Sequence, residues 1–158
     1  MTQVSVVCVG KLKESCWREA VQEYAKRLSA YCRLELDELA EERLPESPTG
    51  AQIEAALDAE AARILPRLEG KTVVALCVEG RGLTSEELAA RMGREIDAGH
   101  KLAFVIGSSH GLSERVKSRA DVRLSFSAMT FPHQLFRVML LEQIYRGFTI
   151  LNGKTYHK

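Results

Sequence analysis

Two short segments of the chain are apolar without interruption, and they restrict the fold more than any other feature. Residues 72–78 read Thr-Val-Val-Ala-Leu-Cys-Val, and residues 102–106 read Leu-Ala-Phe-Val-Ile. A strand with one face in water alternates apolar and polar residues, whereas unbroken runs are typical of parallel strands buried on both faces. Helices must then cover both sides of the sheet, so we expect an α/β fold.

The rest of the chain alternates between strand and helix patterns. Trp17, Val21, Tyr24 and Leu28 recur at spacings of four and three, which predicts an amphipathic helix. Short links between the elements favour one domain, residues 1–158, with an open, mostly parallel sheet of about five strands and helices on both faces. We predict strands at 4–9, 34–39 (an edge strand), 72–78, 102–106 and 122–125, and helices at 12–28, 52–65, 85–98, 113–119 and 132–152.

Composition excludes several classes of protein. Charged residues make up 27% of the chain, and no apolar run is long enough to cross a bilayer, so we expect no membrane association. Residues 1–10 lack the positive start and cleavage site of a signal peptide, so we expect a cytoplasmic protein. The four cysteines are scattered without a C-x-x-C pair, which favours buried free thiols and no metal site.

Charge is distributed unevenly along the chain. Basic residues are in excess in residues 1–33 and 133–158, whereas acidic residues are in excess in residues 35–69. If the fold brings the two ends together, they could hold a polyanion between them. The same pattern also fits solvated helix faces that have no partner.

The loops that follow the predicted strands indicate where a ligand would bind, because α/β sheets bind ligands at the carboxyl ends of their strands. Small or glycine-rich segments follow three of them, at residues 79–83, 107–111 and 126–131. The first strand is followed by Gly-Lys-Leu-Lys, so the dinucleotide fingerprint is absent, and no Walker loop occurs. We therefore place the active site at residues 124–134, where the last strand runs into the last helix.

The segment Gly-Ser-Ser-His-Gly at residues 107–111 fits the G-x-S-x-G pattern of a serine hydrolase, with Ser109 as nucleophile. The chain is small for such an enzyme, and its triad would need Glu114 or Asp121 together with His133. The favoured interpretation is a turn whose glycines let the backbone approach a ligand closely.

The last predicted helix carries two apolar stripes. One stripe would pack on the sheet, and the other needs a partner, which favours an isologous homodimer. The stripes are Val138, Leu141, Tyr145, Phe148 and Phe136, Leu140, Ile144. Between them we place a polar edge of Gln134, Arg137, Glu142 and Arg146, in which Glu142 and Arg146 form a surface i,i+4 pair worth only tenths of a kcal/mol.

Six segments together resemble the RlmH-type ribosomal RNA methyltransferases of the SPOUT class. They are residues 9–13, 78–83, 104–112, 124–138, 142–146 and 156–158, so the resemblance spans the chain. It implies a single SPOUT domain with a C-terminal trefoil knot, a homodimer, and S-adenosylmethionine as methyl donor. The implied substrate is a pseudouridine in a loop of the large-subunit 23S RNA, methylated on ring nitrogen 3. Because a domain of 158 residues has little room for a separate recognition module, we also predict that the dimer recognises RNA shape on an assembled ribosome.

The family's cofactor contacts, carried over by this resemblance, fall on the same three strand ends. They are Leu76, Gly107, Phe126, Ser127, Ala128, Met129, Thr130 and Phe131. Gly107 would allow close approach of the backbone, and the larger apolar side chains would cover the faces of an adenine. For Leu76, Phe126, Met129 and Phe131, simple core packing explains the sequence equally well.

Methylation of an imide nitrogen requires that its proton be removed or the resulting anion stabilised, while positioning supplies much of the rate. The basic C-terminal segment offers His133, Arg137, Arg146, Tyr156 and His157. We suggest His157 or a hydroxide as proton acceptor, with Arg137 or Arg146 holding phosphate or the anionic base.

Tyr156 could stack on an unpaired base of the RNA. Alternatively, the Tyr-His-Lys end only docks the tail. A separate alternative for the whole protein is a non-catalytic RNA-binding module that keeps the basic ends. In the catalytic interpretation, one subunit of the dimer presents RNA to the cofactor of the other, and no metal is needed.

Overall fold

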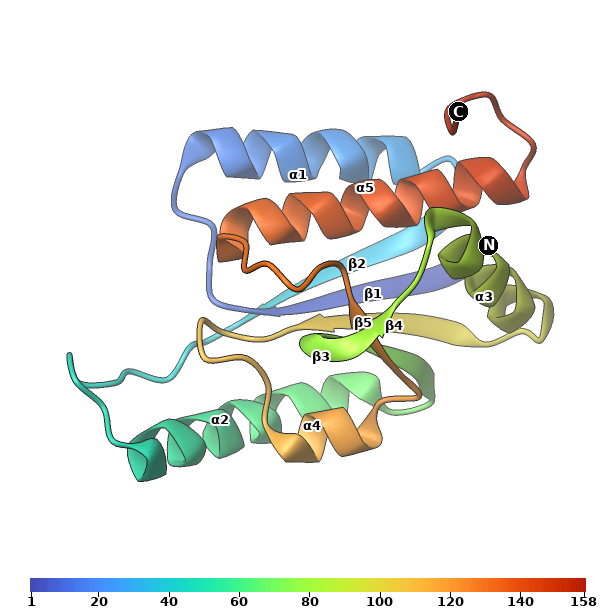
Figure 1. Cartoon of the computed structure of the whole chain (residues 1–158). Helices are drawn as coiled ribbons and strands as arrows, with labels where there is room; N and C mark the ends of the chain where they lie inside the picture. Colours follow the sequence, from blue (N-terminus) through green and yellow to red (C-terminus); the bar gives the residue numbers. More distant parts are fainter.

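The uninterrupted apolar runs form inner strands of a wholly parallel sheet. In the computed structural model, which describes residues 1–158, the strands are β1 (Thr2–Val9), β2 (Cys32–Leu39), β3 (Lys71–Gly82), β4 (Lys101–Ile106) and β5 (Val122–Ser125). Their order in the sheet is β2-β1-β4-β3-β5, and every neighbouring pair is parallel (Figure 1). The predicted α/β class, the five strands and the edge position of β2 are confirmed.

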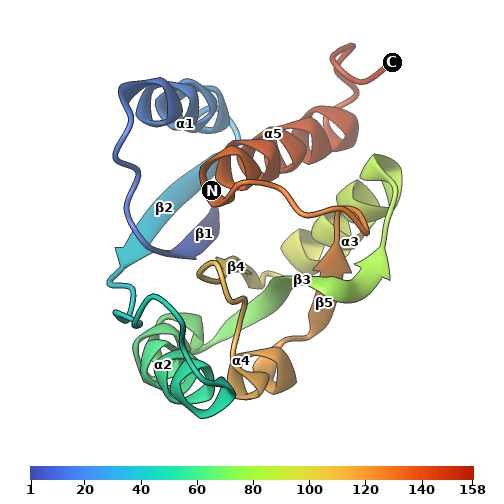
Figure 2. The same cartoon turned by 60° about the vertical axis from the view of Figure 1, so that its left-hand side comes forward.

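Helices cover both faces of this sheet, as predicted. They are α1 (Ser15–Leu28), α2 (Gly50–Ile64), α3 (Ser85–Asp97), α4 (Glu114–Arg119) and α5 (His133–Leu151), with a short 3-10 helix η1 (Leu65–Leu68) after α2. Helices α1, α3 and α5 lie on one face, and α2 and α4 lie on the other (Figures 1 and 2). Capping boxes start two of them, because Thr49 pairs with Gln52 and Thr84 pairs with Glu87.

Each face of the sheet has its own hydrophobic core. Val4, Val6 and Phe104 pack under α1, α3 and α5, whereas Val7 and Val105 pack under α2 and α4. Successive side chains of a strand point to opposite faces, so an inner strand that is covered on both sides must be apolar at every position. This requirement explains the sequence of β4.

Helix α5 is enclosed by its own chain. It lies between α1 and α3, and Tyr145 on α5 meets Tyr24 of α1 at 6.3 Å and Tyr31 at 6.0 Å between ring centroids. Both apolar stripes of α5 are therefore at least partly covered within one chain. The stripes alone do not require a second copy, so a dimer needs support from other observations.

Strand β3 extends beyond its apolar run and bends over β5. Leu76 and Arg81 both pair with Leu124, so residues 77–80 bulge out of the ladder between them. The two backbones touch at Gly80, because a Cβ built there would lie only 2.7 Å from the carbonyl carbon of Leu124. The sequence predicted β3 only to residue 78, since the glycine-rich end does not resemble a strand.

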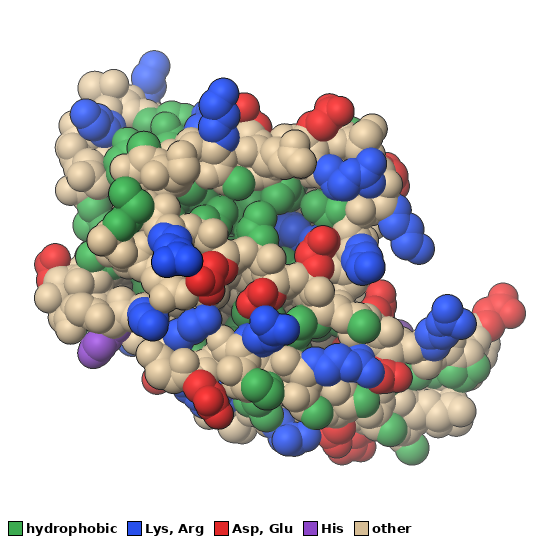
Figure 3. Space-filling view, turned by 180° about the vertical axis from the view of Figure 1, so that it is seen from behind, with side chains coloured by type: hydrophobic (Ala, Val, Ile, Leu, Met, Phe, Trp, Pro, Cys, Tyr) green, Lys and Arg blue, Asp and Glu red, His purple; other side chains and the backbone are tan.

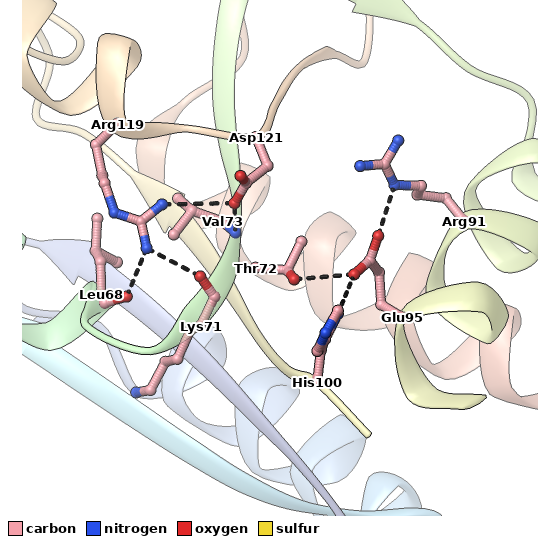
Figure 4. Close-up of polar contacts among 9 residues, drawn as sticks. All are labelled: Leu68, Lys71, Thr72, Val73, Arg91, Glu95, His100, Arg119 and Asp121. Carbon is pink, nitrogen blue, oxygen red and sulfur yellow. Dashed lines mark hydrogen bonds and ion pairs between the residues drawn. The ribbon is translucent and has the colours of Figure 1, made fainter. Parts of the chain in front are cut away.

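A network of polar contacts fixes the amino ends of the strands (Figure 4). The guanidinium of Arg119 donates to the carbonyl oxygens of Leu68 at 3.1 Å and Lys71 at 3.0 Å, and Asp121 accepts from the backbone N–H of Val73 at 2.7 Å. On α3, Glu95 accepts from Thr72 and from His100, and the hydrogen bond from His100 is the main cause of the lowered pKa of Glu95. This network lies at the opposite end of the strands from the predicted site. Its side chains are engaged with one another and with the backbone, so we assign the network a structural role.

The two basic ends of the chain do lie together, because α1 packs beside α5. Seen from behind, however, the surface carries Lys and Arg interspersed with Asp and Glu, above and below a hollow that exposes hydrophobic side chains (Figure 3). Positive and negative side chains are therefore mixed on this face, which is not a uniformly basic surface. All four cysteines are free as predicted, but only Cys8 and Cys32 are buried. Cys77 is partly buried and Cys16 is exposed at the start of α1, so the expectation of buried thiols was wrong for these two.

Candidate active site

The carboxyl ends of β3, β4 and β5 border a cleft of about 540 Å³. Its walls come from the end of β3, from the turn after β4, and from the loop that links β5 to α5. Among the eight predicted cofactor residues, Leu76, Gly107, Phe126, Ser127, Met129, Thr130 and Phe131 line the cleft. Ala128 is exposed and does not contribute to the lining.

One end of the cleft is aromatic. The ring of Phe136 on α5 lies 4.9 Å from the ring of Phe126 and 6.3 Å from that of Phe131, measured between centroids. Leu76 is 6% exposed and belongs to the core, whereas Met129 is 73% exposed. Core packing therefore accounts for Leu76 but not for Met129, whose exposure at the cleft leaves it free to cover a ligand.

The turn after β4 explains why residue 107 is glycine. The N–H of Gly111 donates to the carbonyl oxygen of Ser108 at 2.8 Å, which folds residues 107–111 back on themselves. A Cβ at Gly107 would lie 2.1 Å from the carbonyl oxygen of Gly111. The sequence interpretation assigned this glycine to close approach of a ligand, but the tight turn itself already demands it.

Side chains of the last loop hold its shape. The hydroxyl of Ser125 donates to the carbonyl oxygen of Ser127 at 3.1 Å, and the hydroxyl of Ser127 accepts from the N–H of Met129 at 3.0 Å. Such short serine contacts stabilise a turn locally. The loop at 125–131 is therefore an ordered wall of the cleft.

The other end of the cleft is charged, which sequence reasoning missed. Lys117 on α4 is only 14% exposed at its side chain and forms an ion pair with Glu79. Burial is the largest single effect and acts to lower the pKa of Lys117, but the hydrogen bond to Glu79 and the charges of Glu79 and Glu114 together outweigh it, so the pKa is raised. The same hydrogen bond lowers the pKa of Glu79. Glu79 could have been noticed because it follows a predicted strand, whereas nothing in the sequence marks Lys117.

His133 lines the cleft at the start of α5 as a neutral ring. Burial lowers its pKa, and the nearby positive charge of Arg137 lowers it further. Its Nε2 atom has no hydrogen-bond partner. His133 was one of several candidates in the C-terminal segment, and it is the only one of them that lines the cleft.

The predicted place of Arg137 on a polar edge was wrong. The residue is 2% exposed, and its guanidinium pairs with Glu38 at 2.5 Å and donates to the carbonyl oxygen of Gly10 at 3.0 Å. Glu38 also accepts from the N–H of Leu12 at 3.2 Å. Arg137 thus ties α5 to the loop after β1, and its charge is already engaged.

The remaining catalytic candidates gather on the other side of α5, away from the cleft. Arg146 contacts Glu142 at 2.5 Å, so the predicted i,i+4 pair forms, but it is partly buried rather than on the surface as expected. Arg146 also donates to Nδ1 of His157 at 3.1 Å. Nε2 of His157 lies 2.8 Å from Glu86 at the start of α3, and the hydroxyl of Tyr156 donates to Glu142 at 3.1 Å. We call these five residues the tail cluster.

The surroundings of Tyr156 determine its protonation state. Burial, together with hydrogen bonds to Tyr24 and Glu142, raises its pKa to about 12. The phenol is therefore protonated at neutral pH and can donate a hydrogen bond or stack, but it is a poor base. None of the residues of the tail cluster lines the cleft.

A second cavity of about 500 Å³ lies between α1, α3 and α5. It shares Leu124 and Phe126 with the cleft and Glu142 with the tail cluster. The structure thus assembles the predicted cofactor residues in one place and the residues of the tail in another, with this cavity between them.

The contacts that a serine hydrolase needs are absent. Ser109 and His110 are both exposed and make no side-chain hydrogen bond. Asp121, one proposed partner, is engaged at the amino end of β3 with the N–H of Val73. No group of three or more His, Cys, Asp or Glu side chains is arranged to hold a metal ion, and none of the helices has the length and apolar character to cross a membrane.

Comparisons with known proteins give matches over nearly the whole chain. The family model described as "Predicted SPOUT methyltransferase" matches residues 2–157. The chain is 48% identical over 157 residues to "Ribosomal RNA large subunit methyltransferase H" of Clostridioides difficile (strain 630), covering 98% of this chain and 99% of that protein. It is 46% identical, with the same coverage, to the protein of that name from Clostridium botulinum (strain Langeland / NCTC 10281 / Type F).

Among solved structures, one described as "a probable methylase family protein from Haemophilus influenzae Rd KW20" superimposes with a TM-score of 0.58 at 14% identity, over 99% of this chain and 71% of that one. At such low identity the likeness concerns the fold alone.

Proposed function

The chain belongs to the SPOUT methyltransferase family, and on that premise we propose that it methylates ring nitrogen 3 of a pseudouridine in large-subunit ribosomal RNA, with S-adenosylmethionine as donor. The observation that carries the proposal is the cleft lined by the residues at the ends of β3, β4 and β5. The names of the two relatives support ribosomal RNA as the substrate class. We place the reaction in the cytoplasm and on the assembled ribosome.

The cleft suits the proposed donor in size and chemistry. About 540 Å³ lies within the usual range for small-molecule sites. Phe126, Phe131 and Met129 would cover a flat adenine at the aromatic end, while Lys117 and Glu79 offer a cation and an anion to the zwitterionic amino-acid end. When bound, S-adenosylmethionine supplies a methyl group made electrophilic by the adjacent sulfonium.

The chain's own residues would position the acceptor nitrogen and manage its proton. We assign proton acceptance to Nδ1 of His157, which would have to exchange the N–H of Arg146 that it accepts for the proton of the substrate, while Nε2 stays on Glu86. Arg146 would also place a positive charge near the anionic base. Tyr156, being protonated, would stack on or donate to the base, and Arg137 would act indirectly by fixing the loop at Gly10.

We further propose that the active unit is a homodimer in which the tail of one subunit completes the cleft of the other. Support comes from the separation of the tail cluster from the cleft within a single chain. If an isologous interface places one tail at its partner's cleft, symmetry places the other tail in the same way. Light scattering should then give a mass twice the 17.6 kDa of one chain; a monomer that is active at the same concentration would contradict this.

A trefoil knot in the C-terminal half is proposed as well. It is supported by the tight crossing of residues 77–82 over β5, where Gly80 touches the backbone of Leu124. Stretching one unfolded molecule by its two ends tests the proposal, since a knotted chain tightens and stops short of its full contour length. Extension to the full length of 158 residues would contradict it.

Calorimetric titration with S-adenosylmethionine, followed by methyl transfer to RNA, tests the function as a whole. We expect saturable binding at one site per chain, and transfer to ribosomes that carry the pseudouridine but not to ribosomes with uridine at that position. Free RNA, isolated subunits and whole ribosomes should be compared as acceptors. RNA binding without saturable donor binding would instead indicate a non-catalytic RNA-binding module.

A further inference from the structure

The carboxylate of Glu60 is buried beside the turn at residues 107–111, but Glu60 does not line the cleft. Glu60 lies on α2 and is only 3% exposed, whereas Glu54 and Asp58 on the same helix are exposed. Burying a carboxylate costs several kcal/mol unless hydrogen bonds or a cation compensate. The contacts of Glu60 therefore need an explanation.

Glu60 makes no ion pair; it accepts two hydrogen bonds from neutral donors. One oxygen accepts from the hydroxyl of Ser108 at 2.9 Å, and the other accepts from the backbone N–H of Glu42 at 3.0 Å. These donors lie 48 and 18 residues away in the sequence. A single carboxylate thus joins the turn of the cleft to the segment that follows β2.

Ser108 is the residue through which this contact reaches the cleft. It follows Gly107 directly and lines the cleft itself, and its carbonyl oxygen accepts the N–H of Gly111 that closes the turn. A second contact from α2 holds the far side of the turn, because the hydroxyl of Ser113 donates to Asp58 at 3.0 Å. Helix α2 therefore braces the turn at both ends.

The segment after β2 is fixed by the same helix. Arg63, about one turn after Glu60, donates to the carbonyl oxygen of Ala40 at 2.8 Å and pairs with Glu42. Glu42 is thus held through its side chain by Arg63 and through its backbone by Glu60. The carboxylate of Glu60 is anchored on a fixed segment, so it can in turn fix Ser108.

We propose that Glu60 is a positioning residue for the methyl-donor site. Its carboxylate orients Ser108 and so presents the backbone of residues 107–111 to the donor. The proposal rests on the proposed function for the identity of that ligand, but the bracing of the turn does not. Glu60 does not touch the ligand and takes no part in proton transfer.

The test is a cycle of Glu60→Gln, Ser108→Ala and the double variant, measured by calorimetric titration of the full-length protein with S-adenosylmethionine. Each single variant should weaken binding about tenfold, because a buried hydrogen bond is lost. The double variant should be no weaker than the weaker single variant, since both act through one contact. Glu54→Gln, at an exposed acid of the same helix, should stay within about twofold of the parent.

A second measurement needs no ligand. Amide hydrogen exchange at Gly111 reports whether the turn stays closed, and we expect faster exchange in Glu60→Gln and Ser108→Ala than in Glu54→Gln. Lower thermal stability with unchanged donor affinity and unchanged exchange at Gly111 would overturn the proposal and leave Glu60 a purely structural residue. If the parent protein binds no donor, the proposed function fails, while the exchange data still decide whether Glu60 positions the turn.

Discussion

Replacing Gly107 with Ala is expected to weaken S-adenosylmethionine binding by at least about 100-fold, which corresponds to about 2.8 kcal/mol. The added Cβ would lie 2.1 Å from the carbonyl oxygen of Gly111 and 2.5 Å from its carbonyl carbon. Both atoms belong to the backbone, so no side-chain rotation can relieve the contact. The turn must open, and it would carry the wall of the cleft with it.

Calorimetry on the folded variant measures this effect, and thermal unfolding shows how much of it reflects lost stability. Gly50→Ala is the matched control, because a Cβ at Gly50 meets nothing within 4 Å and the residue lies at the start of α2. We expect the control to bind the donor like the parent. Normal donor affinity in Gly107→Ala would show that donor binding does not depend on this turn. The cleft would then no longer be assigned as the donor site.

The second large effect is expected at the end of the chain. His157→Ala should reduce methyl transfer by about 100-fold or more, as is typical for loss of a general base, while donor affinity stays within about twofold. The reason is the placement of His157, which contacts Arg146 and Glu86 but does not line the cleft. Single-turnover transfer to ribosomes and calorimetry measure the two quantities separately.

Lys158→Ala is the matched control for His157→Ala, since Lys158 is exposed at the next position and its side chain forms no hydrogen bond or ion pair. A parallel loss of donor affinity and thermal stability in His157→Ala would mean that the ring only docks the tail. In that case His133, whose neutral ring lines the cleft, would be the next candidate for the proton acceptor.

Mixing the two variants distinguishes transfer within one subunit from transfer between subunits. In a mixed dimer of Gly107→Ala and His157→Ala chains, one intact cleft faces one intact tail only if tails act across the interface. Random mixing should then restore about a quarter of the parent activity, because half of the dimers are mixed and each has one complete site. No recovery would place cleft and tail function in the same chain.

Much of this fold could be predicted because its signals are local. The apolar runs of β3 and β4 and the spacing of Trp17 and Val21 are properties of neighbouring residues, and they gave the strands, the helices and the three strand ends. The C-terminal part of β3 was missed because pairing with β5 resumes only at residues 81–82, after a bulge at residues 77–80. No periodicity marks such a bulge.

The sequence could not predict which residues, far apart along the chain, contact one another. The spacing of Arg137 suggested a polar edge, but its guanidinium is buried against Glu38, which lies 99 residues away. The pair Lys117 and Glu79 and the pair Glu60 and Ser108 are separated by 38 and 48 residues. The second apolar stripe of α5 was real, yet only the fold shows that α1 and α3 cover much of it.

The strand order has a consequence for how the protein is made. Strand β4 lies between β1 and β3, although it is synthesised after both. While a ribosome is still extending the chain, β1 and β2 can pair, but the other edge of β1 has no strand partner until residues 101–106 have been synthesised. The nascent N-terminal half therefore exposes an unpaired strand edge, which favours aggregation, and the cleft can form only after its last lining residue, Phe136, has been added.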